Sequence, residues 1–426
     1  MPSLLIHNAR ILTLKSPHTD SADAPRRGAD LADLGVIPLG YVRIADGRIA
    51  EVAAGKPADV AGSDQVDVID AGGCVLMPAF VDCHTHACWA GQRLDEFQQK
   101  LEGRAYLDIL KSGGGIMSTV RAVREAPLEE LVALVLRRLY AMAALGTGTV
   151  EIKSGYGLDT DTELKMLRAI HTALGHTLQT IVGTFLGAHA IDPDNSRCVD
   201  LIIEETLPAV ASEFPGITCD AYCEDGAWSL DQTRRLFRAA SELACPLRLH
   251  VDQFNSLGGI RLALEYSAVS VDHLEAIAPA DIKPLAASST IAVLLPCTGF
   301  HLDDRYAPAR ELVDAGAAIA IASNCNPGSA PCLSIPFTIA LAARKLKLKP
   351  QEAITAATFN AACVLGLQKQ VGSIEVGKRA DLQLLDTTDE RSLAHEFAGP
   401  GPLVVIINGE IIQMRGVQME EQTDNG

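Results

Sequence analysis

The sequence predicts an α/β fold, a (β/α)8 TIM barrel with a small composite β-sandwich domain built from both chain ends. In the middle of the chain, eight short apolar runs alternate with helical patterns, whereas both ends carry short strand patterns separated by turn residues. Alternating strands and helices are typical of a parallel sheet, and eight such strands close a barrel. We therefore expect the barrel over 74–368 and the β-domain from 1–73 and 369–426.

The barrel strands are predicted from short runs of apolar and β-branched residues. These runs cover 74–82, 148–153, 179–187, 217–222, 246–251, 268–273, 290–296 and 318–323. Helices fill the segments between them; over 160–174, Leu164, Leu167 and Ile170 recur at helical spacing after an Asp-Thr-Asp start signal. In the terminal domain, strands are predicted over 3–15, 40–52, 66–70, 381–386 and 403–412.

Composition and charge limit the classes of function. The chain has 426 residues, 48% of them hydrophobic, and a formal net charge of −17. Such a charge repels polyanions, so we expect no nucleic-acid or membrane partner, while a local cationic pocket can still hold a small anionic substrate. The N-terminus lacks a secretory signal, and no apolar run reaches the about 18 residues of a membrane span. The eleven cysteines form no CxxC pair, which favours a reduced, cytoplasmic protein.

Polar side chains follow seven of the eight predicted barrel strands, at the end where barrel enzymes place their chemistry. They are His84 and His86, Tyr156, His189, Glu224, His250, His273 and Asn324. Residues i and i+2 of a strand face the same way, so His84 and His86 point together, as two nitrogens on one divalent metal would. His250 is the third ligand candidate. The alternatives are polar loop histidines for the pair, and hydrogen-bonded core histidines for His189 and His273.

A metal held by neutral imidazoles leaves a position open for water and lowers the pKa of that water from 15.7 toward about 7. This chemistry needs a further group, normally a carboxylate, that orients the water and carries its proton. A barrel closes its eighth strand against its first, so residue 324 should lie beside His84 and His86. That residue is Asn324, whose amide cannot accept a proton. His273 is a second candidate for polarising a carbonyl or relaying the proton.

Two further positions suit a small ligand. Arg93 follows the histidine pair by seven residues, and its planar guanidinium matches a substrate carboxylate; the alternative is one ordinary arginine among many. Tyr156 lies in a glycine-flanked turn that lets a ligand approach the backbone. Cys88 and Cys325 are candidates for soft metal ligands, but nothing pairs them, so we expect them to be packing residues.

The order of these motifs resembles the imidazolonepropionases, enzymes of histidine degradation in the amidohydrolase superfamily. The stretches that carry the resemblance are MPAFVDCHTHACWAGQRLDEF, KLEGRAYLDILKSGGGI, VEIKSGYGLDTDTELKMLR, FLGAHA, LHVDQFNSLGG, SVDHLE and NCNPGSAP. They run in order from residue 77 to residue 331, and GSIEVGKRADLQLLD fits the C-terminal part of the β-domain. His-Thr-His alone marks the superfamily, whereas GGGI, KSGYGLD and the Asn-Pro-Gly loop are together specific to this family.

The resemblance implies an amidohydrolase-type barrel that hydrolyses 4-imidazolone-5-propanoate to N-formimidoyl-L-glutamate, by opening the ring at its amide C–N bond. It implies one zinc or iron ion, held by His84, His86, His250 and Asn324. The implied substrate-binding residues are Arg93, Tyr106, Tyr156, His189, Gln253, Asn326, Gly328 and Ser329. His273, Gln253 and Asn324 are the implied catalytic residues, and the resemblance favours a homodimer.

Two positions depart from the pattern of the family. Gln253 stands where some members carry Glu, and Asn324 stands where the family pattern reads Asp. Loss of a general base typically lowers a rate about 10²–10⁴-fold. Two further hypotheses therefore stay open: a weakly active or inactive variant that binds the ligand without turnover, and an amidohydrolase that acts on another cyclic amide or a ring amidine. Arg93 argues against a neutral nucleobase, which needs no carboxylate fork.

Overall fold

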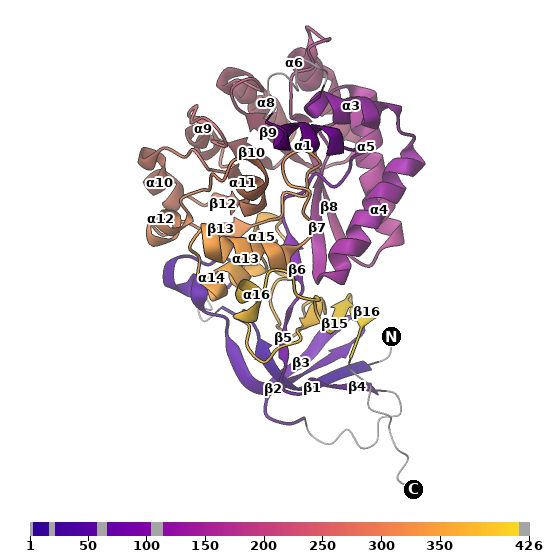
Figure 1. The fold of residues 1–426 in the computed structure, drawn as a ribbon, viewed down its shortest axis with the longest axis vertical. Helices are drawn as coiled ribbons and strands as arrows, with labels where there is room; N and C mark the ends of the chain where they lie inside the picture. The colour runs from indigo at the N-terminus through magenta and orange to yellow at the C-terminus, as the bar shows by residue number, and fades with distance from the viewer. Residues whose placement is uncertain (1–2, 17–21, 58–65, 104–113, 417–426) are drawn as a thin grey trace.

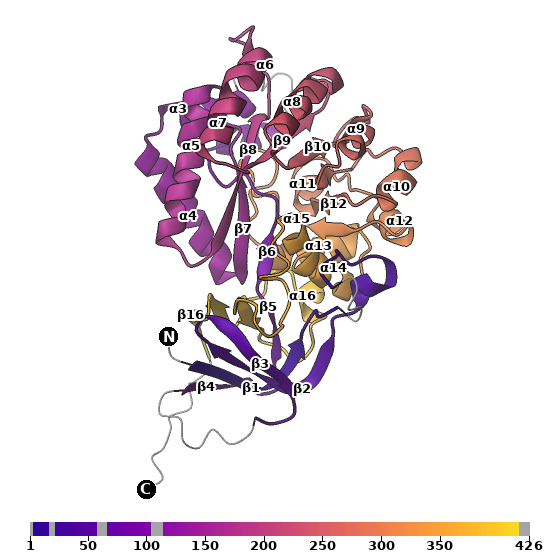
Figure 2. The ribbon, with the colours of Figure 1, turned by 180° about the vertical axis from the view of Figure 1, so that it is seen from behind.

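The structure is a computed structural model that describes residues 3–16, 22–57, 66–103 and 114–416. It has two parts, a large barrel and a small β-domain beneath it (Figure 1). Seen from behind, the N-terminal strands, in indigo, and the C-terminal strands, in yellow, lie together in the small domain (Figure 2). The composite domain predicted from the two chain ends is therefore confirmed.

The barrel is one sheet of eight parallel strands in chain order, each hydrogen-bonded to the next. Its strands are β6 (Phe80–Asp82), β7 (Thr147–Lys153), β8 (Thr180–Ala188), β9 (Thr218–Cys223), β10 (Leu247–Val251), β11 (Ser270–His273), β12 (Ile291–Leu294) and β13 (Ile319–Ile321). Most of their residues are buried, because helices cover the outer face of the sheet and side chains fill its interior. The predicted (β/α)8 TIM barrel is confirmed.

The first and eighth barrel strands meet just beyond their C-terminal ends. Asn324 N donates to the carbonyl of His84 at 3.1 Å. Asp82, the last residue of β6, adds side-chain bonds and accepts from Ser323 N at 3.1 Å and from Ser323 Oγ at 2.5 Å. Residue 324 thus lies beside the segment that carries His84 and His86, as predicted.

Helices connect and cover the strands. They are α1 (Leu94–Leu101), α3 (Ile116–Glu125), α4 (Leu128–Ala144), α5 (Thr160–Ala173), α6 (Cys198–Leu201), α7 (Leu207–Glu213), α8 (Leu230–Glu242), α9 (Gly259–Glu265), α10 (Pro279–Ala286), α11 (Pro296–Leu302), α12 (Ala309–Asp314), α13 (Ile335–Lys345), α14 (Pro350–Ala356), α15 (Phe359–Val364) and α16 (Ser392–His395), with short turns η2 (Gly28–Ala32), η3 (Leu174–His176) and η4 (Ile202–Thr206). The predicted helix α5 begins where Asp159 Oδ1 accepts from Thr162 N at 2.8 Å. This cap satisfies an N–H group that the helix itself leaves unpaired.

The small domain is one mixed sheet in the order β16-β15-β14-β5-β1-β2-β3, with β4 paired to β1. Its strands are β1 (Ser3–Leu12), β2 (Val36–Ala45), β3 (Arg48–Ala54), β4 (Val66–Asp70), β5 (Val75–Pro78), β14 (Leu382–Leu384), β15 (Val404–Ile407) and β16 (Glu410–Met414). Side chains from both chain ends share one apolar core, in which Ile6, Ile44, Leu382 and Ile406 are at most 1% exposed. Neither end supplies this core alone.

Two predicted terminal strands are hairpins in the structure. The strand predicted over 40–52 divides into β2 and β3 around Asp46-Gly47, and that over 403–412 divides into β15 and β16 around Asn408-Gly409. All four turn residues have positive φ, between 50° and 79°. Asn or Asp followed by Gly suits this backbone and is a strong hairpin signal, which here interrupts an apolar pattern.

The prediction of a single strand over 74–82 is wrong. Its first part, β5, lies in the small sheet between β1 and β14, and only β6 enters the barrel. Pro78 has no N–H group to continue a ladder, and Ala79 N instead donates to Asp381 O at 2.9 Å. The chain passes from one sheet to the other within this segment. The domain boundaries at 73/74 and 368/369 stay predictions.

All eleven cysteines belong to the described residues and carry free thiols, and nine of them are buried. Cys88 and Cys325 are among the buried ones and belong to the core of the barrel. In the part of the chain that the structure describes, no helix combines the length and the apolarity needed to cross a membrane.

Candidate active site

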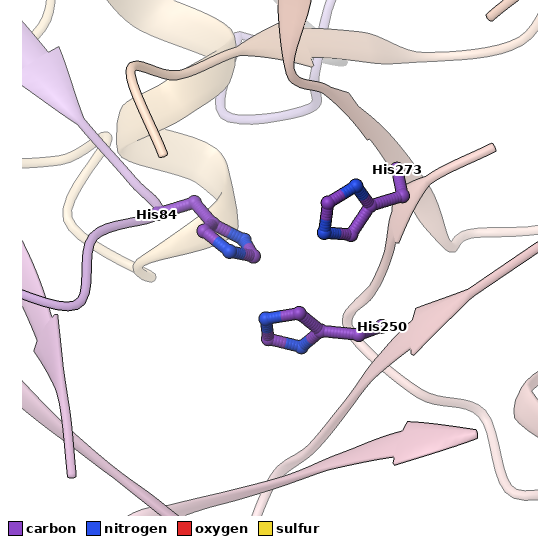
Figure 3. Close-up of side chains that lie close together, drawn as sticks. All are labelled: His84, His250 and His273. Atoms are coloured by element: carbon purple, nitrogen blue, oxygen red, sulfur yellow. The ribbon is translucent and has the colours of Figure 1, made fainter. Parts of the chain in front are cut away.

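Three histidines from three barrel strands form a buried cluster at the C-terminal end of the barrel, with their rings turned toward one another (Figure 3). His84 follows β6, His250 lies in β10 and His273 ends β11. Each offers one ring nitrogen, and these nitrogens lie within 4.8 Å of one another. The three residues are at most 3% exposed. Such a set of imidazoles can hold a metal ion.

His86, predicted as a ligand together with His84, lies against the same cluster. Its Nε2 is 3.4 Å from His250 Nε2, and its ring centroid is 5.3 Å from that of His84. The His86 ring also stacks on His189, with centroids 4.8 Å apart. The structure therefore brings the three predicted ligand histidines together and adds His273 to them.

Asn324 lies three residues beyond β13 and is 1% exposed. Its backbone is left-handed, with φ 53°, a conformation that Asn adopts more readily than most residues. Its Nδ2 donates to Thr298 Oγ1 at 2.7 Å and to Ser329 Oγ at 3.3 Å. Both amide hydrogens are therefore occupied, and the orientation of the amide leaves Oδ1 for a ligand.

Several buried atoms of the site have no hydrogen-bond partner among the residues that the structure describes. They are His84 Nε2, His86 Nδ1 and Asn324 Oδ1. Buried polar atoms normally find a partner, so atoms without one mark a place for a ligand. Imidazole nitrogens and an amide oxygen suit a transition metal ion such as zinc or iron. The donor set fits the metal site expected from the sequence.

Burial lowers the pKa of three of the imidazoles, those of His84, His250 and His189. Burial, together with the nearby charge of Lys153, holds the pKa of His84 well below its ordinary value. Burial also lowers the pKa of His250, against the opposing charge of Asp220. The same cause lowers the pKa of His189 to about 3. Neutral imidazole is the form that binds a metal ion, so these histidines can act as ligands or acceptors at neutral pH.

Carboxylates on β9 and β11 hold two of the imidazoles. Asp272 Oδ2 lies 2.6 Å from His84 Nδ1, and Asp220 Oδ1 lies 3.1 Å from His250 Nδ1. Lys153 Nζ in turn pairs with Asp220 at 2.8 Å. These side chains are at most 3% exposed. The imidazoles therefore sit against a buried layer of charged groups within the barrel.

Arg93 and Tyr156 supply polar groups that suit a carboxylate. Arg93 directly precedes α1; its Nη2 pairs with Glu96 at 2.6 Å, and its buried Nε has no partner in the described part of the chain. The same holds for the buried hydroxyl of Tyr156. Burial raises the pKa of this phenol, which therefore stays a hydrogen-bond donor. The Tyr156 ring centroid lies 6.1 Å from that of His86 and 5.1 Å from that of His189.

The loop that follows Asn324 is shaped by its own side chains. Asn326 Oδ1 accepts from Gly328 N at 2.8 Å and from Ser329 N at 3.2 Å. Gly328 lets the guanidinium of Arg93 come close, because a Cβ at this position would lie 3.1 Å from Arg93 Nη1. The loop therefore places Ser329 beside Asn324 and the Arg93 fork beside Gly328.

Gln253 follows β10, and its Oε1 accepts from the Tyr222 hydroxyl at 2.9 Å. Glu224, which follows β9, accepts from Asn255 N at 3.3 Å and from Asn255 Nδ2 at 2.8 Å. Glu224 thereby fixes the loop that carries Gln253 and acts as a support for the site. Tyr106, the remaining predicted substrate contact, lies outside the described residues.

Comparison with known proteins decides the family. The Amidohydrolase family profile matches residues 75–412. The imidazolonepropionase of Herpetosiphon aurantiacus is 45% identical over 421 residues, which cover 96% of this chain and 98% of that protein. The imidazolonepropionase of Parabacteroides distasonis is 41% identical over 417 residues, covering 96% and 99%. The chain belongs to the imidazolonepropionases of the amidohydrolase family.

Solved structures share the fold of this imidazolonepropionase family member. The 5-methylcytosine deaminase from Klebsiella pneumoniae liganded with 5-fluorocytosine aligns over 98% of this chain and 99% of its own, with a TM-score of 0.72 and 18% identity. E. coli guanine deaminase aligns over 97% and 100%, with a TM-score of 0.72 and 14% identity. At such identities the likeness shows the fold alone.

Several buried residues of this imidazolonepropionase site are missed by reasoning from the sequence. Glu163 accepts from three backbone N–H groups of the turn that carries Tyr156. Asp220 and Asp272 hold imidazoles, and Thr298 holds the amide of Asn324. The two aspartates do carry a signal, since an acidic residue inside an apolar strand pattern must find a buried partner. Thr298 has no such signal in the sequence.

Proposed function

We propose that the protein hydrolyses 4-imidazolone-5-propanoate to N-formimidoyl-L-glutamate in histidine degradation. The oxygen of water joins the ring carbonyl carbon, the amide C–N bond breaks, and the departing nitrogen takes a proton. One observation carries the proposal: the ring of Tyr156, whose hydroxyl has no partner among the described residues, lies 6.1 Å from the ring of His86, which itself lies against the buried histidine cluster. The cluster suits the activation of water, and the hydroxyl suits the propionate.

We propose that a single zinc or iron ion is held by His84, His86, His250 and Asn324. The unpartnered His84 Nε2 and Asn324 Oδ1 support this set, as does the 3.4 Å approach of His86 Nε2 to His250 Nε2. Such an ion, when bound, polarises the amide carbonyl and makes water nucleophilic near neutral pH. His273 competes with His86 for the third histidine position, because it shares the cluster of His84 and His250.

His273 is the residue best placed to carry a proton from water to the leaving nitrogen. Its Nδ1 lies 3.4 Å from Glu275 Oε1, so a proton on Nδ1 faces the carboxylate and leaves Nε2 as the acceptor. The φ of His273 is 90°, an unusual conformation that the surrounding structure has to hold and that is common at functional sites. Asn324 cannot take this role, since an amide oxygen is not a base.

Other side chains bind and orient the substrate in this proposal. The partnerless Arg93 Nε and Tyr156 hydroxyl donate to the propionate. His189 donates its Nδ1 proton to Gly155 O at 3.0 Å, which leaves Nε2 as an acceptor for a ring N–H group. The Oε1 atom of Gln253 is taken by a tyrosine hydroxyl, so its NH2 group is the donor for the substrate.

The direct test uses metal-free protein reloaded with one equivalent of Zn²⁺ or Fe²⁺. We expect loss of the ultraviolet absorbance of 4-imidazolone-5-propanoate and appearance of N-formimidoyl-L-glutamate by mass spectrometry. An imidazolone without the propionate is the matched control and should turn over far more slowly. No product with either metal would overturn the proposal, and release of ammonia from cytosine or guanine would assign the site to a ring amidine instead.

We also propose a homodimer that works in the cytoplasm. The free thiols of all eleven cysteines support a reducing compartment. Light scattering on the purified protein should give twice the mass of the chain, and the mass of a single chain would contradict the proposed homodimer.

A further inference from the structure

A buried hydrogen-bond network lies directly beside His84. Asp272 Oδ2 accepts from both His84 Nδ1 and Arg248 Nη2, each at 2.6 Å. Asp272 Oδ1 accepts from Ser270 Oγ, also at 2.6 Å. Arg248 and Asp272 side chains are 2% and 0% exposed. Each carboxylate oxygen therefore has a defined donor, and none of these donors comes from solvent.

Arg248 also fixes the backbone that leads into His84. Its Nε donates to Ser270 Oγ at 2.8 Å, and its Nη1 donates to Cys83 O at 2.9 Å. Nη1 lies 3.1 Å from Glu151 Oε1 as well. The other oxygen of Glu151 accepts from Thr85 N at 3.0 Å. One guanidinium and its carboxylate partners thus hold the chain on both sides of His84.

We propose that Asp272, clamped by Arg248 and Ser270, is a positioning residue that fixes the His84 imidazole with Nε2 toward the cluster. A carboxylate only accepts hydrogen bonds, so the ring proton resides on Nδ1 and the lone pair on Nε2. Nε2 of His84 lacks a hydrogen-bond partner within the described ranges of the chain. The inference rests on the proposed function only in that the cluster binds a metal ion.

Loss of a purely structural ion pair should lower the stability of the protein without changing its affinity for a metal ion. Asp281 and Arg261 offer the comparison, because Asp281 is a buried carboxylate on α10 that pairs with Arg261 at 2.8 Å. Its arginine partner is 69% exposed, and neither residue belongs to the histidine cluster. Removal of either aspartate should lower stability, but only removal of Asp272 should change the affinity for a metal ion.

The experiment measures Zn²⁺ affinity of the full chain by competition with a chromophoric chelator. Asp272→Ala should weaken Zn²⁺ binding about 10–100-fold, which is the usual effect of losing such a partner of a ligand histidine. Asp272→Asn should recover part of the affinity, since an amide oxygen can still accept from Nδ1. Asp281→Ala should bind Zn²⁺ like the unaltered protein. Equal affinity of Asp272→Ala and the unaltered protein would overturn the proposal.

Asp272→Ala removes one of the two carboxylate partners of the buried Arg248, so a second measurement is made on the unaltered, metal-free protein. Long-range ¹H–¹⁵N spectra report which ring nitrogen of His84 carries the proton. We expect the proton on Nδ1, and a proton on Nε2 or on both nitrogens would overturn the proposal. If Zn²⁺ binding depends on Asp272 in this way but the protein leaves the imidazolone intact, the proposed function is overturned and the role of Asp272 still stands.

Discussion

The two sides of the site are built in different ways. On the side of the first strand, His84 is held by a carboxylate, Asp272, which is itself ion-paired to Arg248. On the side of the eighth strand, Asn324 is held by neutral hydroxyls, those of Thr298 and Ser329. Both His84 and Asn324 are almost fully buried. Burial is therefore common to His84 and Asn324, whereas only His84 has a charged hydrogen-bond partner among these side chains.

Because of this difference, substitutions should be tolerated poorly around His84 and well at residue 324. A buried ion pair tolerates little change, because removing one partner leaves an uncompensated charge. A hydroxyl can donate as well as accept, so Thr298 and Ser329 can rotate to serve a carboxylate in place of an amide. The pocket around residue 324 therefore accepts Asp without rebuilding, although the chain carries Asn.

The largest effect is expected from breaking the histidine side. His250→Ala should reduce bound metal and activity to background, because the cluster loses a central ligand. His86→Ala should also lose the metal, because His86 belongs to the proposed ligand set. His273→Ala should keep the metal and lose about 10²–10⁴-fold in kcat, the range for a missing general acid or base. Metal content is measured by mass spectrometry after gel filtration.

His301→Ala is the control for these variants. Its ring stacks on Phe97, with centroids 5.6 Å apart, and it does not belong to the cluster. It should keep both metal and rate. If His273→Ala loses the metal and His86→Ala keeps it, the ligand set is His84, His250 and His273, and the proton must be carried elsewhere.

The next largest effect on kcat is expected when a charge is introduced at residue 324. Asn324→Asp should raise kcat by about 10²–10⁴-fold, because a carboxylate beside the cluster can accept the proton of water. Asn326→Asp is the matched control in the same loop; its side-chain oxygen serves backbone N–H groups, so no gain is expected. The kcat values of the two variants are compared from steady-state rates at saturating metal. An unchanged kcat in Asn324→Asp would show that a carboxylate at residue 324 takes the proton no better than His273, the residue proposed to carry it.

A smaller effect is expected at the anchor for the propionate, which lies between the two sides. Arg93→Lys should raise KM about 10–100-fold with little change in kcat, since a hydrogen bond to a charged group is lost. Tyr156→Phe should act in the same direction. The penalty should vanish for an imidazolone without the propionate. An equal penalty for both compounds would mean that Arg93 supports the loop at Gly328 and does not bind the substrate.

The barrel could be predicted because its strands depend on local patterns. Seven of the eight predicted strands overlap one barrel strand each, and His250 and His273 lie on β10 and β11 as expected. The exception is the segment 74–82, where Pro78 breaks the ladder and the two halves join different sheets. That division depends on pairing with β14, some 300 residues away in the chain, which no local pattern reports.

The places of the histidines along the barrel could be predicted from the sequence, but the residues that support them could not. The spacing of His84 and His86 points to a metal because adjacent positions on one face can share an ion. The support of His84 by Asp272 and Arg248 joins three different strands, and its residues are separated by up to 188 positions. Only the fold brings them together. Such supports can be sought in a sequence as charged residues inside apolar strands, but their partners cannot be assigned.

The smallest effect concerns Asp82, where the two sides are joined through Ser323. Burial raises the pKa of Asp82 to about 7, far above the usual range of an aspartate near 4. The folded state therefore binds more protons than the unfolded state between about pH 4 and about pH 7. The stability from protonated Asp82 is full below this window and is lost as the pH rises through about 7.

Asp82→Asn removes this titration while keeping an acceptor for Ser323 N. In metal-free protein, the free energy of unfolding of the variant should fall less steeply than that of the unaltered protein as the pH rises from about 5 to about 8. The difference in slope cannot exceed about 1.4 kcal/mol per pH unit for one proton. Urea unfolding at several pH values measures both curves. Parallel curves would mean that Asp82 is ionised over the whole pH range. A charged carboxylate would then lie between the first and eighth strands, and the surroundings of Asn324 would carry a charge as those of His84 do.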